Sequence, residues 1–98
     1  MALTTTQKNI QKDIITLSDE WNGYVTCEFS IHADHLPYVK QLISCIHLKN
    51  GGWIVRRCPT CVEHHGANSL HVEIVTPEQL KLYNKHNIRI LAQGPINN

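Results

Sequence analysis

The sequence predicts an α+β protein with a ferredoxin-like βαββαβ antiparallel sheet and an extra N-terminal amphipathic helix. Two patterns predict this class: stretches of alternating apolar and polar residues, typical of half-buried strands, and stretches with apolar residues at helical spacing. The chain has 98 residues, 42% hydrophobic and 17% charged, which is enough for one modest core. We expect a single domain over 1–98, with an N-terminal helix at 6–18, a ferredoxin-like core at 23–92 and a frayed tail at 93–98.

Charge and hydropathy exclude several classes of protein. Nine basic and eight acidic side chains leave a net charge of +1, so the field of the whole molecule does not recruit nucleic acid. No apolar run approaches the roughly 18 residues that a membrane span needs. Residues 1–11 also lack the basic start and apolar stretch of a signal peptide. We therefore expect a cytoplasmic protein without a membrane anchor.

The first predicted element is an amphipathic helix from about Thr6 to Ser18, with one of three threonines as its N-cap. Its apolar stripe consists of Leu3, Ile10, Ile14, Leu17 and Trp21. An alternative makes residues 16–21 a strand that turns at Asn22-Gly23, because Asn-Gly is a strong hairpin signal. A helix must bury its apolar stripe, so we expect it to lie across the sheet face or to pair with a second copy in a homodimer.

Three strands and a second helix follow. Residues 24–31 alternate and predict a strand with Cys27, Phe29 and Ile31 on its core face. A helix then starts at Asp34 as cap, with an apolar arc that consists of Leu36, Val39, Leu42, Ile43 and Ile46. Two short strands at 53–57 and 69–75 are separated by a polar segment at 58–68, which we interpret as a loop.

A strong start signal introduces the last helix. Thr76 can cap it and Gln79 can close a capping box. The helix is expected to run to about His86, and Asn87 can turn the chain in a left-handed conformation. A last strand at 88–91 completes the βαββαβ pattern.

The sequence is unusual in its seven His and four Cys residues. Since no export signal precedes them, the cysteines are expected to be reduced thiols. Cys58 and Cys61 stand in C-P-T-C, a spacing at which two thiolates on a tight turn can bind one cation. The predicted path of the chain brings imidazoles to the same end of the sheet. We therefore expect a zinc site made by Cys58 and Cys61 and completed from His64, His65, His32 and His35.

Two other interpretations of the C-P-T-C segment remain open. The motif is also typical of thiol redox pairs in which a helix N-terminus lowers the pKa of one thiol, although the residues after Cys61 do not resemble a helix start. Alternatively, Cys58 and Cys61 are thiols in a polar loop and the histidines are surface side chains. In a zinc site, four protein ligands would indicate a structural role, and three ligands with a water would indicate catalysis.

The open face of the sheet is a possible partner-binding surface. Stacking and charge are expected there from Tyr24, Trp53, Arg56 and Arg57. Glu28 and Glu73, expected as neighbours on the two central strands, would repel phosphate. We interpret these two carboxylates, together with His71, as the solvated side of the sheet and not as an acid and base pair.

These observations favour a small regulatory or inhibitory module that binds another protein and is not an enzyme, because so short a chain carries no sign of a substrate cleft. The alternatives are a zinc-dependent or thiol-redox enzyme that uses the same Cys/His cluster, and a module that binds RNA or single-stranded DNA through the sheet face.

Overall fold

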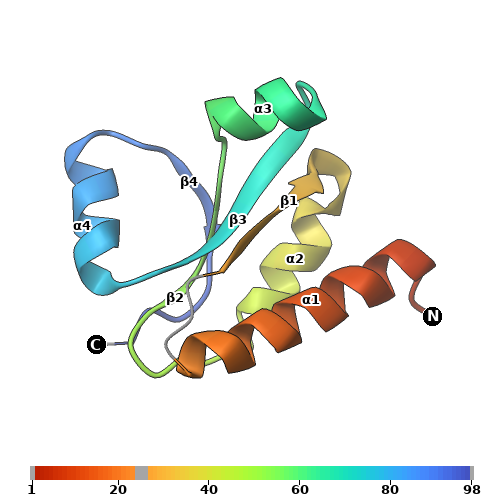
Figure 1. Cartoon of the computed structure of the whole chain (residues 1–98), viewed down its shortest axis with the longest axis horizontal. Coiled ribbons are helices and arrows are strands. Elements are labelled where there is room, and N and C mark those ends of the chain that lie inside the picture. The colour runs from red at the N-terminus through yellow and green to blue at the C-terminus, as the bar shows by residue number, and fades with distance from the viewer. Residues whose placement is uncertain (1, 24–26, 98) are drawn as a thin grey trace.

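A computed structural model of the chain describes residues 2–23 and 27–97. This described part has an α+β fold in which helices flank a four-stranded antiparallel sheet (Figure 1). The elements in chain order are α1 (Thr5–Asn22), β1 (Glu28–His32), a 3₁₀ turn (Ala33–His35), α2 (Leu36–Ile43), β2 (Gly52–Arg56), α3 (Pro59–His65), β3 (Ser69–Val75), α4 (Pro77–Lys85) and β4 (Ile90–Gln93).

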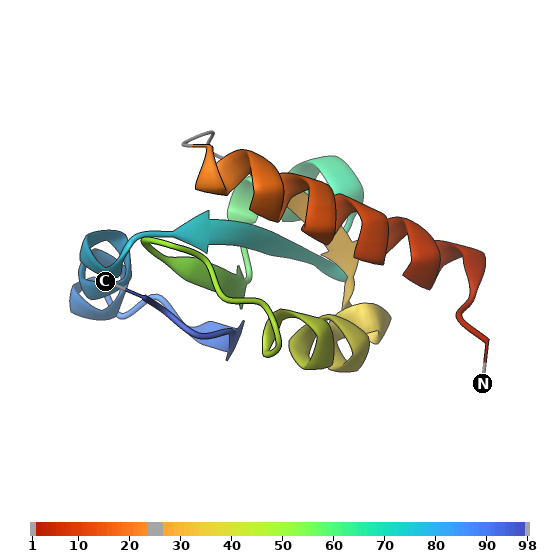
Figure 2. The same cartoon turned by 90° about the horizontal axis from the view of Figure 1, so that it is seen from below.

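The helix α1 confirms the predicted N-terminal helix and excludes the alternative strand at 16–21. Thr4 caps it with a capping box, and the helix continues without a break to Asn22. Ile10 and Ile14 are buried in the core. The first half of α1 extends beyond the edge of the sheet in both views (Figures 1 and 2).

The strand order is β1-β3-β2-β4, and each neighbouring pair is antiparallel. This order does not bear out the ferredoxin-like arrangement, in which the last strand lies beside the first. Here β4 lies beside β2 instead, so the connections through α2 and α4 each skip one strand, whereas α3 joins the neighbouring strands β2 and β3. The positions of the four strands along the chain were predicted well, but the strand that β4 pairs with was not.

Contacts after β4 explain why the last strand pairs with β2. The N–H of Gly94 donates to the carbonyl of Trp53 at 2.9 Å, and the N–H of Asn97 donates to the carbonyl of Gly51 at 3.0 Å. A Cβ atom at Gly52 would overlap the carbonyl oxygen of Pro95, so this close approach requires glycine. The expectation of a frayed tail at 93–98 was therefore wrong for the described residues 93–97.

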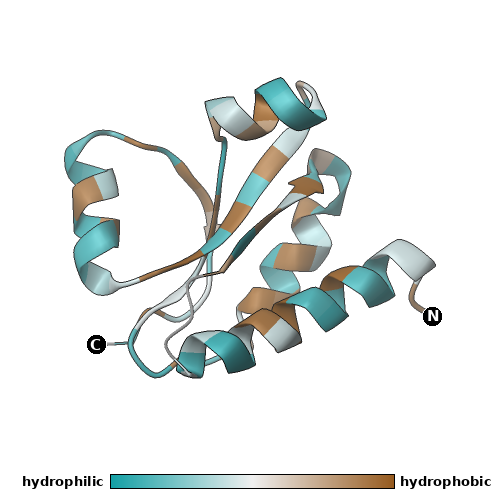
Figure 3. Ribbon diagram, in the orientation of Figure 1, coloured by the Kyte–Doolittle hydropathy of each residue, from teal (hydrophilic) through white to brown (hydrophobic). Residues whose placement is uncertain are grey.

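The two faces of the sheet have different roles. One face carries the buried apolar residues that pack with α1 and α2, and the core on this side includes Ile31, Trp53, Val55, Leu70 and Val72. Apolar and polar bands alternate along β3, as Figure 3 shows, because successive side chains point to opposite faces. The polar residues of β3 therefore face away from this core, toward the side of the sheet where α4 lies (Figure 1).

Candidate metal centre

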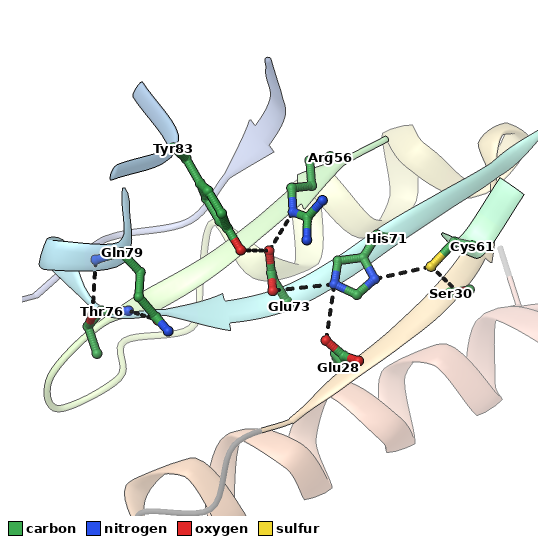
Figure 4. A network of polar contacts seen from close by, with 9 residues as sticks. All are labelled: Glu28, Ser30, Arg56, Cys61, His71, Glu73, Thr76, Gln79 and Tyr83. Carbon is green, nitrogen blue, oxygen red and sulfur yellow. Dashed lines mark hydrogen bonds and ion pairs between the residues drawn. The ribbon is translucent and has the colours of Figure 1, made fainter. Parts of the chain in front are cut away.

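Three neighbouring strands build the polar face of the sheet. Glu28 of β1 lies opposite Glu73 of β3, and Ser30 lies opposite His71. On the other side of β3, His71 is paired with Arg56 of β2. These side chains project to one face, where they meet residues from α3 and α4 (Figure 4).

His71 lies at the centre of this network and is only 5% exposed. Its Nε2 lies 3.2 Å from a carboxylate oxygen of Glu28 and 3.3 Å from one of Glu73, in ion-pair contacts that lack hydrogen-bond geometry. Its Nδ1 lies 3.2 Å from Sγ of Cys61. A neutral ring with its proton on Nε2, on the side of the two carboxylates, would direct the Nδ1 lone pair at the sulfur. The Glu73 carboxylate is the main cause that raises the pKa of His71, and burial opposes it.

Glu73 is a buried carboxylate with strong donors around it. It accepts a hydrogen bond from Nε of Arg56 at 2.6 Å and another from the hydroxyl of Tyr83 at 2.8 Å. The guanidinium of Arg56 also lies 5.0 Å from the centre of the Tyr83 ring. Burial alone would raise the pKa of Glu73, but its contacts with His71, Arg56 and Tyr83 outweigh burial and lower the pKa to about 2. Glu73 is therefore ionised at neutral pH.

The C-P-T-C segment begins a helix, and our interpretation of it as a loop was wrong. Cys58 is the N-cap of α3, with extended backbone angles, and Pro59 takes the first helical position. Backbone N–H groups of Cys61 and Thr60 stabilise the Cys58 thiolate and lower the pKa of Cys58. The helix start that the redox interpretation requires is therefore present.

Cys61 connects α3 to the sheet. Its Sγ accepts a hydrogen bond from the Ser30 hydroxyl at 3.2 Å and contacts Nδ1 of His71 at 3.2 Å. Burial raises the pKa of Cys61. Since none of the residues of α3 itself is buried, these two contacts to β1 and β3 are important in positioning the helix.

The two thiols and His71 form a group that could hold a metal ion. Sγ of Cys58, Sγ of Cys61 and a ring nitrogen of His71 all lie within 4.8 Å of one another. Two thiolates and an imidazole are donors that zinc prefers. The carboxylates behind His71 correspond to the outer partners that orient metal-bound imidazoles in other proteins. The donor set and its surroundings therefore fit zinc.

His64 and His65, which were predicted as ligands, lie in the last turn of α3 and are exposed. Their ring atoms are not part of the three-residue group. Both residues nevertheless line a pocket of about 240 Å³ together with Cys61 and His71. They are thus near the site without completing it.

His32 and His35 are placed differently. Nδ1 of His32 accepts a hydrogen bond from the N–H of Asp34 at 3.1 Å and so caps the 3₁₀ turn. His32 and His65 line a separate pocket of about 310 Å³. His35 is the residue before α2 and, like His32, is not part of the group of Cys58, Cys61 and His71.

The residues predicted to bind a partner do not form one surface in the described part of the chain. Trp53 is fully buried at 0% exposure and donates from Nε1 to the Ser18 hydroxyl at 2.9 Å. The charge of Arg56 is paired with Glu73. Arg57 is exposed and donates to the carbonyl of Ala67 at 2.7 Å. Tyr24 lies outside the described residues.

Sequence reasoning missed the importance of His71 and Glu73, which we expected on the solvated side of the sheet. Both are buried, at 5% and 9% exposure, because α3 and α4 border this face. The alternation along β3 correctly predicted that the two side chains share a face, but it gave no information about what covers that face. The spacing His-x-Glu on a central strand was the only local signal available.

Comparisons with protein-family models, with curated proteins and with solved structures found no match for this chain. Among the described residues, no helix combines the length and the apolar character that crossing a membrane requires.

Proposed function

We propose that this protein is a zinc-stabilised module in which Cys58, Cys61 and His71 bind the ion. The observation that carries this proposal is that the three donor atoms come from the start of α3, with its N-cap, and from β3, and lie within 4.8 Å of one another. Thiolate and imidazole donors in this combination favour zinc over calcium or magnesium, which prefer oxygen ligands.

A structural role for zinc follows from the weak attachment of α3. The helix has seven residues and none of them is buried. An isolated helix of this length is unstable in water. Metal bonds from its first turn to β3 would hold it against the sheet, and such bonds contribute directly to the free energy of folding.

The fourth ligand decides between a structural and a catalytic site. His65 stands four residues after Cys61, so the two side chains lie on neighbouring turns of one helix face, and both line the 240 Å³ pocket. A change of rotamer could bring His65, or His64, to the ion and close the site. We propose this closed arrangement, and a water in the fourth position is the enzyme alternative.

For the whole module we propose the binding of another protein, in a regulatory or inhibitory role. A closed zinc site leaves no open coordination position for a substrate, which supports this role over catalysis. The carboxylate of Glu28 on the polar face, with 65% of its side chain exposed, favours a protein partner over nucleic acid.

The zinc content of untagged protein, with thermal melting before and after chelation, tests the proposal. We expect about one zinc per chain. Chelation should lower the melting temperature by roughly 10–20 °C, because an ion at about 100 times its Kd adds about 2.7 kcal/mol of stability. Cys58→Ser, Cys61→Ser and His71→Gln should each lose the metal. Cys45→Ser is the matched control, since Cys45 is exposed and lies outside the group.

The same experiment can contradict the proposal. Protein that carries no zinc, even after refolding with the metal, would exclude the site. Metal loss in Cys45→Ser would show that the ligands are wrongly assigned. Cobalt substitution then separates a structural site from a catalytic one. A tetrahedral absorption spectrum that changes in His65→Ala or His64→Ala supports the closed site. A spectrum that changes only when an external ligand is added supports the enzyme alternative.

A further inference from the structure

We propose that Cys58 and Cys61, in the metal-free protein, exchange with external disulfides and form a reversible disulfide with each other. The inference is independent of zinc, because it depends on the geometry of the two thiols and of His71. The thiols stand three residues apart in the first turn of α3, and their sulfurs lie within 4.8 Å. Rotation of the side chains can therefore close a bond between them.

Cys58 is positioned as the attacking thiol. It is half-buried and forms the N-cap of α3, with no capping hydrogen bond to its side chain. Its position before the first turn of a helix leaves its sulfur as the one that an external disulfide can approach, and attack requires its thiolate form. The sulfur of Cys61, in contrast, is occupied by the Ser30 hydroxyl and the His71 ring.

His71 is positioned to activate Cys61 as the resolving thiol. Nδ1 of His71 lies 3.2 Å from Cys61 Sγ, which is within reach for the neutral ring to accept the thiol proton at that nitrogen. It can therefore take the thiol proton as Cys61 becomes a nucleophile. The imidazolium that results lies beside two carboxylates, which stabilise its charge.

The exchange balances in two steps. The Cys58 thiolate attacks one sulfur of the external disulfide RSSR, so that a Cys58–SR bond forms, the S–S bond breaks and one RS⁻ leaves. Cys61 then gives its proton to His71 and attacks the Cys58 sulfur, so that the Cys58–Cys61 bond forms and the second RS⁻ leaves. RSSR is reduced by two electrons to two thiols, and the Cys58/Cys61 pair is oxidised by two electrons. His71 passes its proton to the leaving thiolate or to water.

The substrate class is a disulfide with at least one accessible sulfur. The pocket beside Cys61, of about 240 Å³, is lined by polar groups that include Thr60, His64 and Glu28. Its size suits part of a small disulfide or a short peptide segment. A low-molecular-weight disulfide and a protein disulfide offer the same reacting atoms, so the experiment includes both.

The experiment is a redox titration of metal-free protein in a chelator, with reduced and oxidised glutathione in defined ratios and rapid trapping of thiols for mass spectrometry. We expect an intramolecular disulfide, with a loss of two hydrogens, at Cys58 and Cys61, and no such loss in Cys58→Ser or Cys61→Ser. Cys45→Ser should behave like the wild type. A second series uses a disulfide-bonded peptide, and faster oxidation by one of the two oxidants identifies the preferred source.

His71→Gln separates the proposed proton transfer from simple proximity of two thiols. The first step should be nearly unchanged, and the second should slow by about 100-fold, a typical effect of removing a general base, so that the mixed disulfide on Cys58 accumulates. Wild-type protein that forms no Cys58–Cys61 disulfide at any ratio would overturn the inference, and so would an unchanged second step in a folded His71→Gln variant. Neither result depends on whether the protein binds zinc, which is measured separately.

Discussion

Neutralising Glu73 should strongly destabilise the protein, because its carboxylate is the counter-charge of Arg56, a mostly buried arginine. The side chains of Arg56 and Glu73 are 15% and 11% exposed, and Nε lies 2.6 Å from the carboxylate. Glu73→Gln leaves the Arg56 charge without its counter-ion; removal of one partner from a fully buried pair costs about 3–5 kcal/mol, and the partial exposure of Arg56 places this pair at the lower end. The pKa of Glu73, lowered from 4.5 to about 2, gives a similar figure of about 3 kcal/mol.

Urea unfolding at neutral pH, in the presence of a chelator, measures this loss without any contribution from metal. We expect Glu73→Gln to lose about 3 kcal/mol, which corresponds to a melting temperature roughly 12–24 °C lower. Glu28→Gln is the matched control: Glu28 lies opposite Glu73 and contacts the same imidazole, but its side chain is 65% exposed, so the loss should stay below about 1 kcal/mol.

A double-mutant cycle tests the physical reason. Arg56→Met with Glu73→Gln removes both charges, so the double variant should be more stable than the sum of the two single losses predicts, by more than about 1 kcal/mol. If Glu73→Gln were as stable as Glu28→Gln, or if the two losses were additive, the ion pair would not be the source of the stability and the reasoning would fail.

Three further predictions concern acid stability and the core. Because the pKa of Glu73 is lowered in the folded state, its contribution to the free energy of unfolding is present above the unfolded pKa near 4.5 and is lost as the pH falls toward about 2. Curves of the free energy of unfolding against pH should therefore be flatter over this range for Glu73→Gln than for the wild type. Ile14→Ala should cost about 2–5 kcal/mol in urea unfolding, since Ile14 is 0% exposed, whereas Ile15→Ala, at a residue 48% exposed, should cost less than about 1 kcal/mol. Ser18→Ala leaves Nε1–H of buried Trp53 without its acceptor, and a calorimetric loss outside about 1–3 kcal/mol would contradict the importance of this bond.

Signals that act within a few residues predicted their elements correctly. Thr76 and Gln79 form the expected capping box at the start of α4. Asn87 has the expected left-handed conformation, with φ of 59°. Alternation placed Phe29 and Ile31 on the core side. In each case the geometry depends on neighbouring residues along the chain, which the sequence displays directly.

Features that depend on distant contacts were not predictable in the same way. The short helix α3 has no buried residue and so lacks the apolar periodicity by which a helix is recognised. The place of β4 depends on hydrogen bonds from Gly94 and Asn97 to β2, which no local pattern indicates. The proximity of His71 to the two thiols depends on α3 lying over β3, so the sequence indicated Cys58 and Cys61 as members of the group but not His71.

The geometry of His71 links the two proposals, because one lone pair serves both. Zinc would take the Nδ1 lone pair together with both sulfurs, whereas disulfide exchange needs that lone pair for the Cys61 proton and both sulfurs for the new bond. The two states therefore exclude each other at one chain. Zinc at about 100 times its Kd leaves only about 1% of the chains metal-free, so the rate of oxidation should fall about 100-fold. The carboxylates of Glu28 and Glu73 contact the same imidazole in both states, and the supply of metal and of oxidant decides which state the protein occupies.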